Sequence, residues 1–274
     1  MIFAVLGGDG RSVRLVHLLR ADGHTVRHFG LERALVDGET DAAEALRSAE
    51  AVILPLPAEK GELLNAPFAA EPVELMEALR TARPGTPVCA GKAGEVTRTA
   101  CGALGLPLRD YFQLESFTQR NAELTADATV DMLEKRCALP EKRVLISGFG
   151  RIGKALAQRL RERGSVVTVA ARSEQARAAA ERMDCRALPL PDAPAAAYDF
   201  VVNTVPSVIF GAGEIAAFGA AELIELASPP YGFDLAAAKA AGKAVTVASG
   251  LPGKYFPEAA AAAVRDAIYE ILEE

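Results

Sequence analysis

Residues 143–154 read Arg143-Val144-Leu145-Ile146-Ser147-Gly148-Phe149-Gly150-Arg151-Ile152-Gly153-Lys154. The stretch begins as a short apolar strand, continues with glycines spaced G-x-G-x-x-G, and passes into a helical pattern that stops at Gly164. Each glycine suits a mechanical task. Gly148 allows a tight turn, Gly150 lets a ligand approach the backbone, and Gly153 lets the helix pack closely on the strand.

The position of this loop between a strand and a helix predicts a dinucleotide site. The N-terminus of the helix offers unpaired N–H groups and the positive end of its dipole to phosphates. We therefore assign cofactor binding to the six residues of the loop: Gly148, Phe149, Gly150, Arg151, Ile152 and Gly153. The alternative is a glycine-rich turn without a ligand, and the flanking strand and helix disfavour it.

The end of the next strand distinguishes between the two common dinucleotides. Residues 166–171 read Val-Val-Thr-Val-Ala-Ala and are followed by Arg172 and Ser173. An NAD site usually carries Asp or Glu there, whereas a guanidinium and a hydroxyl suit the 2′-phosphate of NADP. In the alternative, Arg172 is a solvated surface residue and Ser173 caps a helix. The missing acid favours NADP.

Composition excludes several functional classes. The 274 residues are enough for two domains, and a formal net charge of −6 argues against nucleic acid as a partner. No apolar run reaches membrane-spanning length, and the N-terminus lacks the basic region of a signal peptide. The four cysteines form no C-x-x-C pair, which predicts reduced thiols in a cytoplasm and no metal site.

A second glycine loop opens the chain. Residues 2–6 form an apolar strand, residues 7–12 read Gly-Gly-Asp-Gly-Arg-Ser, and a helical pattern follows. Loops at the carboxyl ends of parallel strands bind ligands in open α/β sheets. The guanidinium of Arg11 and the helix N-terminus could hold a substrate carboxylate, or the segment could be a plain turn with Arg11 in solvent. The residues alone leave both readings open.

Alternating strands and helices predict an α/β protein with two Rossmann-like parallel-sheet domains and a cleft between them. We expect an N-terminal substrate domain over residues 1–116, a connecting helix over 117–138 and an NADP-binding domain over 139–256. A closing helix over 257–274 should pack back between the domains. Both glycine loops should face the cleft. Three strand-end segments should ring the nicotinamide: Thr204-Val205-Pro206, Ala227-Ser228-Pro229 and residues 250–254.

Finer expectations concern three other stretches. Residues 51–57 should be a strand ended by prolines, residues 59–62 should begin a polar loop, and residues 73–83 should form a helix.

This domain order resembles the 2-hydroxyacid and alanine dehydrogenases, and the chain is more closely similar to the A subunits of bacterial dipicolinate synthases. The similarity is carried by six stretches: residues 7–11, 121–126, 148–154, 203–206, 226–234 and 250–254. They span nearly the whole length. Asp127-Ala128 departs from the Glu-Gly expected in that family, which leaves the role of that helix segment open.

The resemblance implies NADP-dependent oxidation of a dihydrodipicolinate-type intermediate of the lysine pathway to dipicolinate. It also implies sporulation as the context, the cytoplasm of the mother cell as the location, and partnership with a flavoprotein-like B subunit; a homo-oligomer is also compatible. The substrate is a small dicarboxylate, for which the candidate residues are Arg11, Ser12 and Lys254, followed by Lys92 and Asn121.

Two other functions stay open. One is a different NADP-linked dehydrogenase of a small hydroxy or amino acid. Such an enzyme would be expected to use a His–carboxylate pair in the second domain, where the sequence has no histidine. The other is a non-catalytic NADP-binding subunit. Turnover by the isolated chain separates these hypotheses.

Overall fold

The computed structural model describes residues 1–39 and 41–273 and divides the chain into two compact units. Unit 1 comprises Met1–Asn121 together with Pro252–Glu274, and unit 2 comprises Ala122–Leu251. The boundaries fall within helix α5 (Glu115–Glu134) and within the short helix α10 (Leu251–Tyr255). Glu274, the last residue of the predicted closing helix, lies outside the described residues.

Unit 1 contains a five-stranded parallel sheet in the order β2-β1-β3-β6-β7. Its strands are β1 (Ile2–Leu6), β2 (Thr25–Phe29), β3 (Ala51–Ile53), β6 (Val88–Ala90) and β7 (Leu108–Asp110). The other elements are α1 (Gly10–Ala21), α2 (Ala42–Leu46), α3 (Leu75–Leu79), α4 (Glu95–Leu104), η1 (Tyr111–Gln113), α11 (Pro257–Glu273) and the hairpin strands β4 (Glu59–Lys60) and β5 (Leu63–Leu64). The order reverses between β1 and β3, which makes that position the switch point of the sheet.

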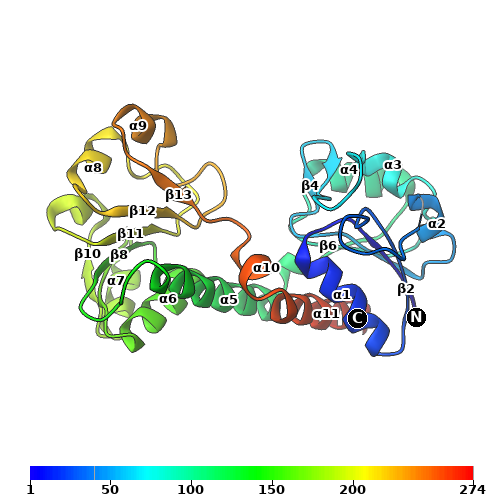
Figure 1. The fold of residues 1–274 in the computed structure, drawn as a ribbon, viewed down its shortest axis with the longest axis horizontal. Coiled ribbons are helices and arrows are strands. Elements are labelled where there is room, and N and C mark those ends of the chain that lie inside the picture. The colour runs from blue at the N-terminus through cyan, green and yellow to red at the C-terminus, as the bar shows by residue number, and fades with distance from the viewer. Residues whose placement is uncertain (40, 274) are drawn as a thin grey trace. The chain divides into compact units, whose positions relative to one another are not determined.

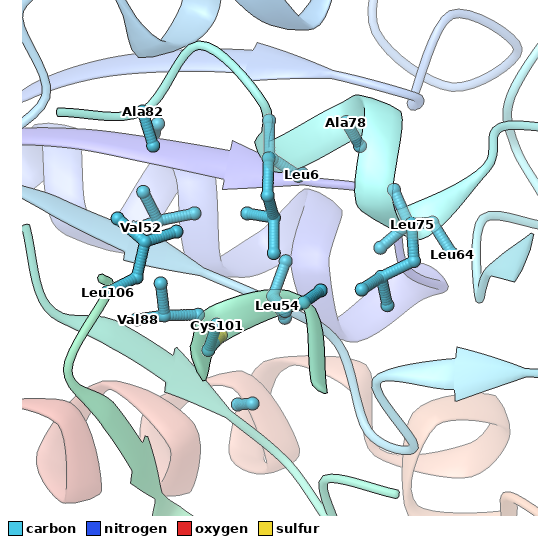
Figure 2. Close-up of a cluster of buried hydrophobic side chains, with 14 of the residues drawn as sticks. Leu6, Val52, Leu54, Leu64, Leu75, Ala78, Ala82, Val88, Cys101 and Leu106 are labelled. Atoms are coloured by element: carbon cyan, nitrogen blue, oxygen red, sulfur yellow. The ribbon is translucent and has the colours of Figure 1, made fainter. Parts of the chain in front are cut away.

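Strand β1 shows why both faces of this sheet are covered. Phe3 and Val5 point to the face packed by α1 and α11, whereas Ala4 and Leu6 point to the face packed by α2, α3 and α4. Figure 1 shows these two groups of helices on opposite sides of the sheet. Figure 2 shows the second core, in which Leu6 and side chains from the other strands meet those of the helices. A sheet buried on both faces explains the nearly continuous apolar strands.

Unit 2 contains a six-stranded parallel sheet in the order β10-β9-β8-β11-β12-β13. Its strands are β8 (Arg143–Ser147), β9 (Val166–Ala170), β10 (Arg186–Leu188), β11 (Phe200–Asn203), β12 (Glu222–Glu225) and β13 (Val245–Val247). Its remaining helices are α6 (Arg151–Glu162), α7 (Glu174–Glu181), η2 (Leu190–Ala195), α8 (Ala212–Ala217) and α9 (Leu235–Ala240). Helices α8 and α9 lie on the face opposite α6 (Figure 1).

If the six strands are numbered from β8 in chain order, their order across the sheet is 3-2-1-4-5-6, the order of dinucleotide-binding sheets. The switch point lies between β8 and β11, where a ligand crevice is expected in such sheets. The α/β class with two parallel sheets is therefore confirmed.

Several local expectations were wrong. The predicted polar loop at residues 59–62 contains strand β4, which pairs with β5, and the helix predicted over 73–83 is only α3. The connecting helix begins two residues earlier than expected and ends at Glu134. Residues 250–254, expected to be a strand-end loop, enter helix α10 after Gly250, which has a φ of 66°. Two-residue strands and single-turn helices carry too few residues for a periodic pattern.

Candidate functional site

The glycine loop of unit 2 lies at the switch point, against the end of β11. Gly148 has a φ of 87°, and a Cβ there would lie 2.7 Å from both Thr204 Oγ1 and Val205 Cγ2. A side chain at Gly153 would collide with the carbonyl oxygen of Gly148. Two of the three glycines are therefore required by the packing of β8, α6 and the segment after β11.

Gly150 has a different role, because a Cβ there would meet no heavy atom within 4 Å. It is the N-cap of α6, and its ordinary backbone angles (φ −80°, ψ −161°) do not demand glycine. Among the residues that the structure describes, no side chain caps this helix end. Its N–H groups and dipole are thus left for a phosphate, so the residues fit the pyrophosphate of a dinucleotide. Phe149 is buried beside it, Ile152 is half-buried and Arg151 is exposed.

Three polar side chains lie beyond the end of β9. Arg172 and Ser173 are exposed, and Ser173 Oγ caps α7 by accepting a hydrogen bond from Ala176 N at 3.2 Å. The capping role offered as an alternative for Ser173 is therefore present. Sequence reasoning missed Arg177, whose Nη1 donates to the carbonyl oxygens of Ala171 and Arg172 at 2.9 Å each. Its position in α7, four residues after the N-cap Ser173, was the available signal, because residues four apart lie on one face of a helix.

The segment after β11 is held by hydrogen bonds to neighbouring strand ends. Thr204 Oγ1 donates to the carbonyl oxygen of Ser147 at 2.8 Å, and Val205 N donates to Asn203 Oδ1 at 3.1 Å. Pro206 is exposed immediately after them. This packing brings the segment against the Gly148 loop, as expected from the topology.

The segment after β12 depends on a carboxylate that sequence reasoning missed. Glu225 is fully buried and accepts a hydrogen bond from Ala227 N at 2.8 Å, which places Ala227 and Ser228 next to the strand end. An acid within an apolar strand was its sequence signal, because an uncompensated buried charge is costly.

In unit 1, Arg11 lies in the first turn of α1 and is not in solvent. Its side chain is only 10% exposed and forms a bidentate ion pair with Asp9, with Nε–Oδ1 at 3.0 Å and Nη2–Oδ2 at 2.8 Å. Nη2 also donates to the carbonyl oxygen of Leu56 at 2.6 Å, across the switch point between β1 and β3. The solvent-exposed alternative for Arg11 is therefore wrong.

Burial and pairing act in opposite directions on this ion pair. Burial alone would raise the pKa of Asp9, but the hydrogen bonds and charge of Arg11 hold that pKa below its usual value. Burial likewise opposes the charged form of Arg11, and Asp9 raises its pKa. Both groups are therefore charged near neutral pH. Burial raises the pKa of the neighbouring Tyr111 phenol, which stays neutral and donates to the carbonyl oxygen of Leu54.

The other substrate candidates differ in placement. Ser12 is buried on α1, Asn121 lies on α5, and Lys92 is exposed after β6 with a φ of 51°. Gly91, the residue before Lys92, exchanges backbone hydrogen bonds with the segment after β3, where Leu56 receives Arg11. Arg11, in the first turn of α1, and Lys92, after β6, therefore both lie at the carboxyl ends of the strands of this sheet.

Lys254 also belongs to unit 1, not to the nucleotide domain as predicted. Gly253 packs on the Asp9–Arg11 pair so closely that a Cβ there would lie 2.9 Å from both Arg11 Nε and Asp9 Oδ2. This contact brings the exposed Lys254 next to the start of α1.

Other classes of site are not found in the described part of the chain. Within residues 1–39 and 41–273, no group of three His, Cys, Asp or Glu side chains suits a metal ion, and the four cysteines are free. Among residues 1–39 and 41–273, no helix has both the length and the apolar character needed to cross a membrane.

Asp127, where the sequence departs from its resemblance, accepts a hydrogen bond from Arg159 Nε of α6 at 2.7 Å. The substituted position thus links α5 to the nucleotide-loop helix.

Comparisons with known protein families assign the two halves separately. The family of the N-terminal domain of the dipicolinate synthase A subunit matches residues 2–112. The family described as "D-isomer specific 2-hydroxyacid dehydrogenase, NAD binding domain" matches residues 108–217, which include the Gly148 loop and β9. Unit 2 therefore carries an NAD(P)-binding, dehydrogenase-like domain.

Relatives extend this assignment to the full length. The A subunit of dipicolinate synthase from Bacillus subtilis (strain 168) is 24% identical, covering 99% of this chain and 95% of the relative. The solved A subunit of the Bacillus halodurans synthase has a TM-score of 0.86 at 22% identity, covering 100% and 98%. A transhydrogenase from Sinorhizobium meliloti has a TM-score of 0.71 at 16% identity, covering 100% and 93%. The solved structures establish the fold, and the family match over residues 2–112 together with the full-length relative makes this chain similar to dipicolinate synthase A subunits along nearly its whole length.

Proposed function

We propose that this chain is an NADP-dependent oxidoreductase that converts a dihydrodipicolinate-type intermediate of the lysine pathway into dipicolinate, which is pyridine-2,6-dicarboxylate. The observation that carries the proposal is the uncapped N-terminus of α6 behind Gly150, on a dehydrogenase-like sheet. It is the kind of site that holds a dinucleotide pyrophosphate. The identity of the substrate rests on the similarity of this chain to dipicolinate synthase A subunits.

The proposed reaction removes two electrons and two hydrogens from the ring. The bound cofactor would accept a hydride from a ring carbon, one proton is released, and the ring becomes aromatic. The residues of the chain bind and orient the substrate and exclude competing geometries. Since aromatisation drives the step, positioning is the main demand on the protein.

The residues that we assign to cofactor binding follow the carboxyl ends of four strands, β8, β9, β11 and β12. Those assigned to the phosphates and the nicotinamide are residues 148–153, Thr204, Val205, Pro206, Ala227 and Ser228. Arg172 is assigned to the 2′-phosphate, and Arg177 supports it because its Nη1 is anchored on the carbonyl oxygens of Ala171 and Arg172. Two guanidiniums suit a phosphate, which favours NADP over NAD.

The substrate carboxylates need fixed cations, and unit 1 supplies them. Asp9 and Leu56 hold the Arg11 guanidinium by Nε and Nη2, while its Nη1 donates no hydrogen bond to the described residues. We assign one carboxylate to this Nη1 and the other to Lys254, which follows the glycine packed on the same pair. Ser12, Lys92 and Asn121 are assigned to the remaining polar atoms of the substrate.

The full-length relative is the A subunit of its synthase, which supports a second, different subunit in the working enzyme. We infer that this partner is a flavoprotein-like B subunit. The pair would work during sporulation, in the cytoplasm of the mother cell.

The test mixes the purified chain, the lysine-pathway precursor and NADP, with the B subunit in a parallel reaction. We expect the ultraviolet band of dipicolinate to appear together with the absorbance of NADPH. If neither appears in either reaction while hydroxy acids are oxidised, the dipicolinate assignment is wrong. Product only in the presence of the B subunit would assign the turnover to the complex.

Site variants test the substrate residues in the same assay. Lys254→Ala should raise the KM of the substrate and leave NADP binding unchanged, because an unpaired substrate charge costs about 2–5 kcal/mol. Lys239→Ala, an exposed lysine on α9, is the matched control. Wild-type kinetics for both Lys254→Ala and Arg11→Ala would remove these residues from the site.

No histidine occurs after residue 28, so the His–carboxylate pair expected of a hydroxyacid dehydrogenase is absent from unit 2.

A further inference from the structure

Glu225, at the carboxyl end of β12, is the centre of a buried hydrogen-bond network in unit 2. Its exposed fraction is zero, and both carboxylate oxygens accept two hydrogen bonds. Oε1 accepts from Asn203 Nδ2 at 2.6 Å and from Ala227 N at 2.8 Å. Oε2 accepts from Gly232 N at 2.8 Å and from Phe233 N at 3.2 Å. One side chain therefore binds both ends of the segment 227–233.

The network continues to the two neighbouring strands. Asn203 Oδ1 accepts from Ser147 Oγ at 2.7 Å and from Val205 N at 3.1 Å, and its Nδ2 also donates to the carbonyl oxygen of Val205. Ser147, Asn203 and Glu225 are the last residues of β8, β11 and β12, which are adjacent in the sheet. The network therefore lies directly behind the Gly148 loop and the switch point.

The segment 227–233 has a backbone conformation that is unfavourable for its residues in isolation. Tyr231 has a φ of 67°, which is unfavourable for a side chain of its size. A Cβ at Gly232 would collide with the Asn203 amide, so glycine is required there. Such backbone persists where surrounding contacts determine it. Glu225 supplies three of these contacts, and backbone hydrogen bonds from Ile209 N and Phe210 N to the carbonyl oxygen of Gly232 supply two more.

The chemistry of Glu225 is unusual for a purely structural acid. Among residues 1–39 and 41–273, no Lys, Arg or His lies within ion-pair distance of it. An unpaired buried carboxylate is costly, and apolar packing would fill the same space at lower cost. A carboxylate offers what an apolar side chain cannot, namely acceptors for three backbone N–H groups from separate parts of one loop.

We propose that Glu225 is the positioning residue for the nicotinamide half of the cofactor: it holds segment 227–233 in the conformation that receives the nicotinamide. The inference rests on the proposed assignment of this strand end to the nicotinamide, while the adenosine half is bound elsewhere, by residues 148–153 and Arg172. Loss of the Glu225 acceptors should therefore affect one half of the cofactor and not the other.

The test compares two ligands, NADPH and 2′-phospho-ADP-ribose, which lacks only the nicotinamide ring. Their dissociation constants are measured by calorimetry with the wild type and with Glu225→Gln, whose amide nitrogen turns a donor toward N–H groups. We expect Glu225→Gln to weaken NADPH binding about tenfold or more, because buried donors lose their acceptor. Binding of 2′-phospho-ADP-ribose should change by less than about twofold.

Matched variants separate positioning from general stability. Asp199 accepts a backbone hydrogen bond from Arg143 at the opposite end of β11, so Asp199→Asn should leave both affinities unchanged. If Glu225→Gln does not melt cooperatively, the same two dissociation constants are measured with Ser147→Ala instead. It removes one bond to Asn203 and should weaken NADPH selectively by about threefold.

Equal weakening of both ligands, or of neither, would overturn the positioning role. No dihydrodipicolinate is present in this experiment, so failure of the proposed reaction would leave its result intact. If NAD is the true cofactor, the same split is expected between NADH and ADP-ribose.

Discussion

The two glycine loops occupy equivalent places in the two units. Each follows the first strand of its parallel sheet and begins a helix. Gly7 N donates to the carbonyl oxygen of Phe29, the last residue of β2, at 2.8 Å. Gly148 N likewise donates to Ala170, the last residue of β9, at 2.9 Å. Counted from these glycines, the N-cap of α1 is Asp9 and the N-cap of α6 is Gly150.

The difference at the N-cap separates their chemistry. Asp9 Oδ1 accepts from Arg11 N at 3.0 Å, and the carboxylate also binds the Arg11 guanidinium, so this helix end already holds an anion. Gly150 provides no side chain, and the end of α6 is open. Two similar loops thus differ by one carboxylate. The first supports a fixed arginine, and the second is available to a phosphate.

The largest effect on cofactor binding is expected from Gly150→Asp, which gives the second loop the N-cap carboxylate of the first. Its Cβ has open space, and Asp is a preferred N-cap, so the melting temperature should hold or rise. A carboxylate about 4 Å from a pyrophosphate costs about 4 kcal/mol, so NADPH affinity should fall roughly 1000-fold. Calorimetry and thermal melting measure both effects.

Gly150→Ser is the control for charge, because it caps the helix with a neutral side chain. It should weaken NADPH far less than Gly150→Asp. Equal losses for the two variants would mean that bulk, and not an anion site, distinguishes the loops.

The reverse change removes the carboxylate from the first loop. Asp9→Ala leaves the buried Arg11 charge without its partner and should lower the free energy of unfolding by about 3 kcal/mol. Asp9→Asn keeps a cap and should cost less. Chemical denaturation at pH 7 measures the difference, and an unchanged midpoint would show that the pair contributes nothing.

The pH dependence of the same pair has a defined sign. The folded pKa of Asp9 lies below its unfolded value, so the pair stabilises the fold above about pH 4. This contribution is lost as the pH falls through the folded pKa. The stability gap between wild type and Asp9→Asn should therefore narrow below about pH 4. A gap independent of pH would contradict the assignment.

The second strands extend the contrast. The loop after β2 carries an acid, Glu32, which accepts a hydrogen bond from Gly30 N at 2.6 Å. The loop after β9 carries a base, the exposed Arg172. Arg172→Asp should weaken NADP by about 1.5–3 kcal/mol, because a charge-assisted phosphate contact is lost, and should shift preference toward NAD. Titration with both cofactors measures this. Persistence of the NADP preference would leave Arg177 as the remaining candidate.

The smallest effect concerns Ser173, for which the structure shows a capping role. Ser173→Ala should lower the free energy of unfolding by about 1 kcal/mol through loss of the α7 cap. If Ser173 also binds the 2′-phosphate, NADP affinity falls while NAD affinity does not. Equal affinities in the variant and the wild type would restrict Ser173 to capping.

The sequence predicted features that depend on regular patterns. The strand, glycine loop and helix around Gly148 were identified because their spacing reflects local geometry, and the alternation of elements gave two parallel sheets. The hairpin at Glu59 was missed because two-residue strands have no period. Arg11 could not be placed, since its burial depends on Leu56 and Gly253, which are distant in sequence. Glu225 was missed because its function depends on where backbone N–H groups converge.

The packing of Gly253 on Asp9 and Arg11 has a consequence for synthesis of the protein. Unit 2 is one continuous stretch, whereas unit 1 needs residues from both ends of the chain. Val264, Ile268 and Ile271 of α11 complete the core that covers α1. On the ribosome, the first 121 residues therefore lack α11, so only α1 is present to cover one apolar face of their sheet while the nucleotide domain emerges. Unit 1 is thus the last to be completed, and a chain truncated before Pro252 should keep its nucleotide domain but lose the packing of Gly253 on Arg11.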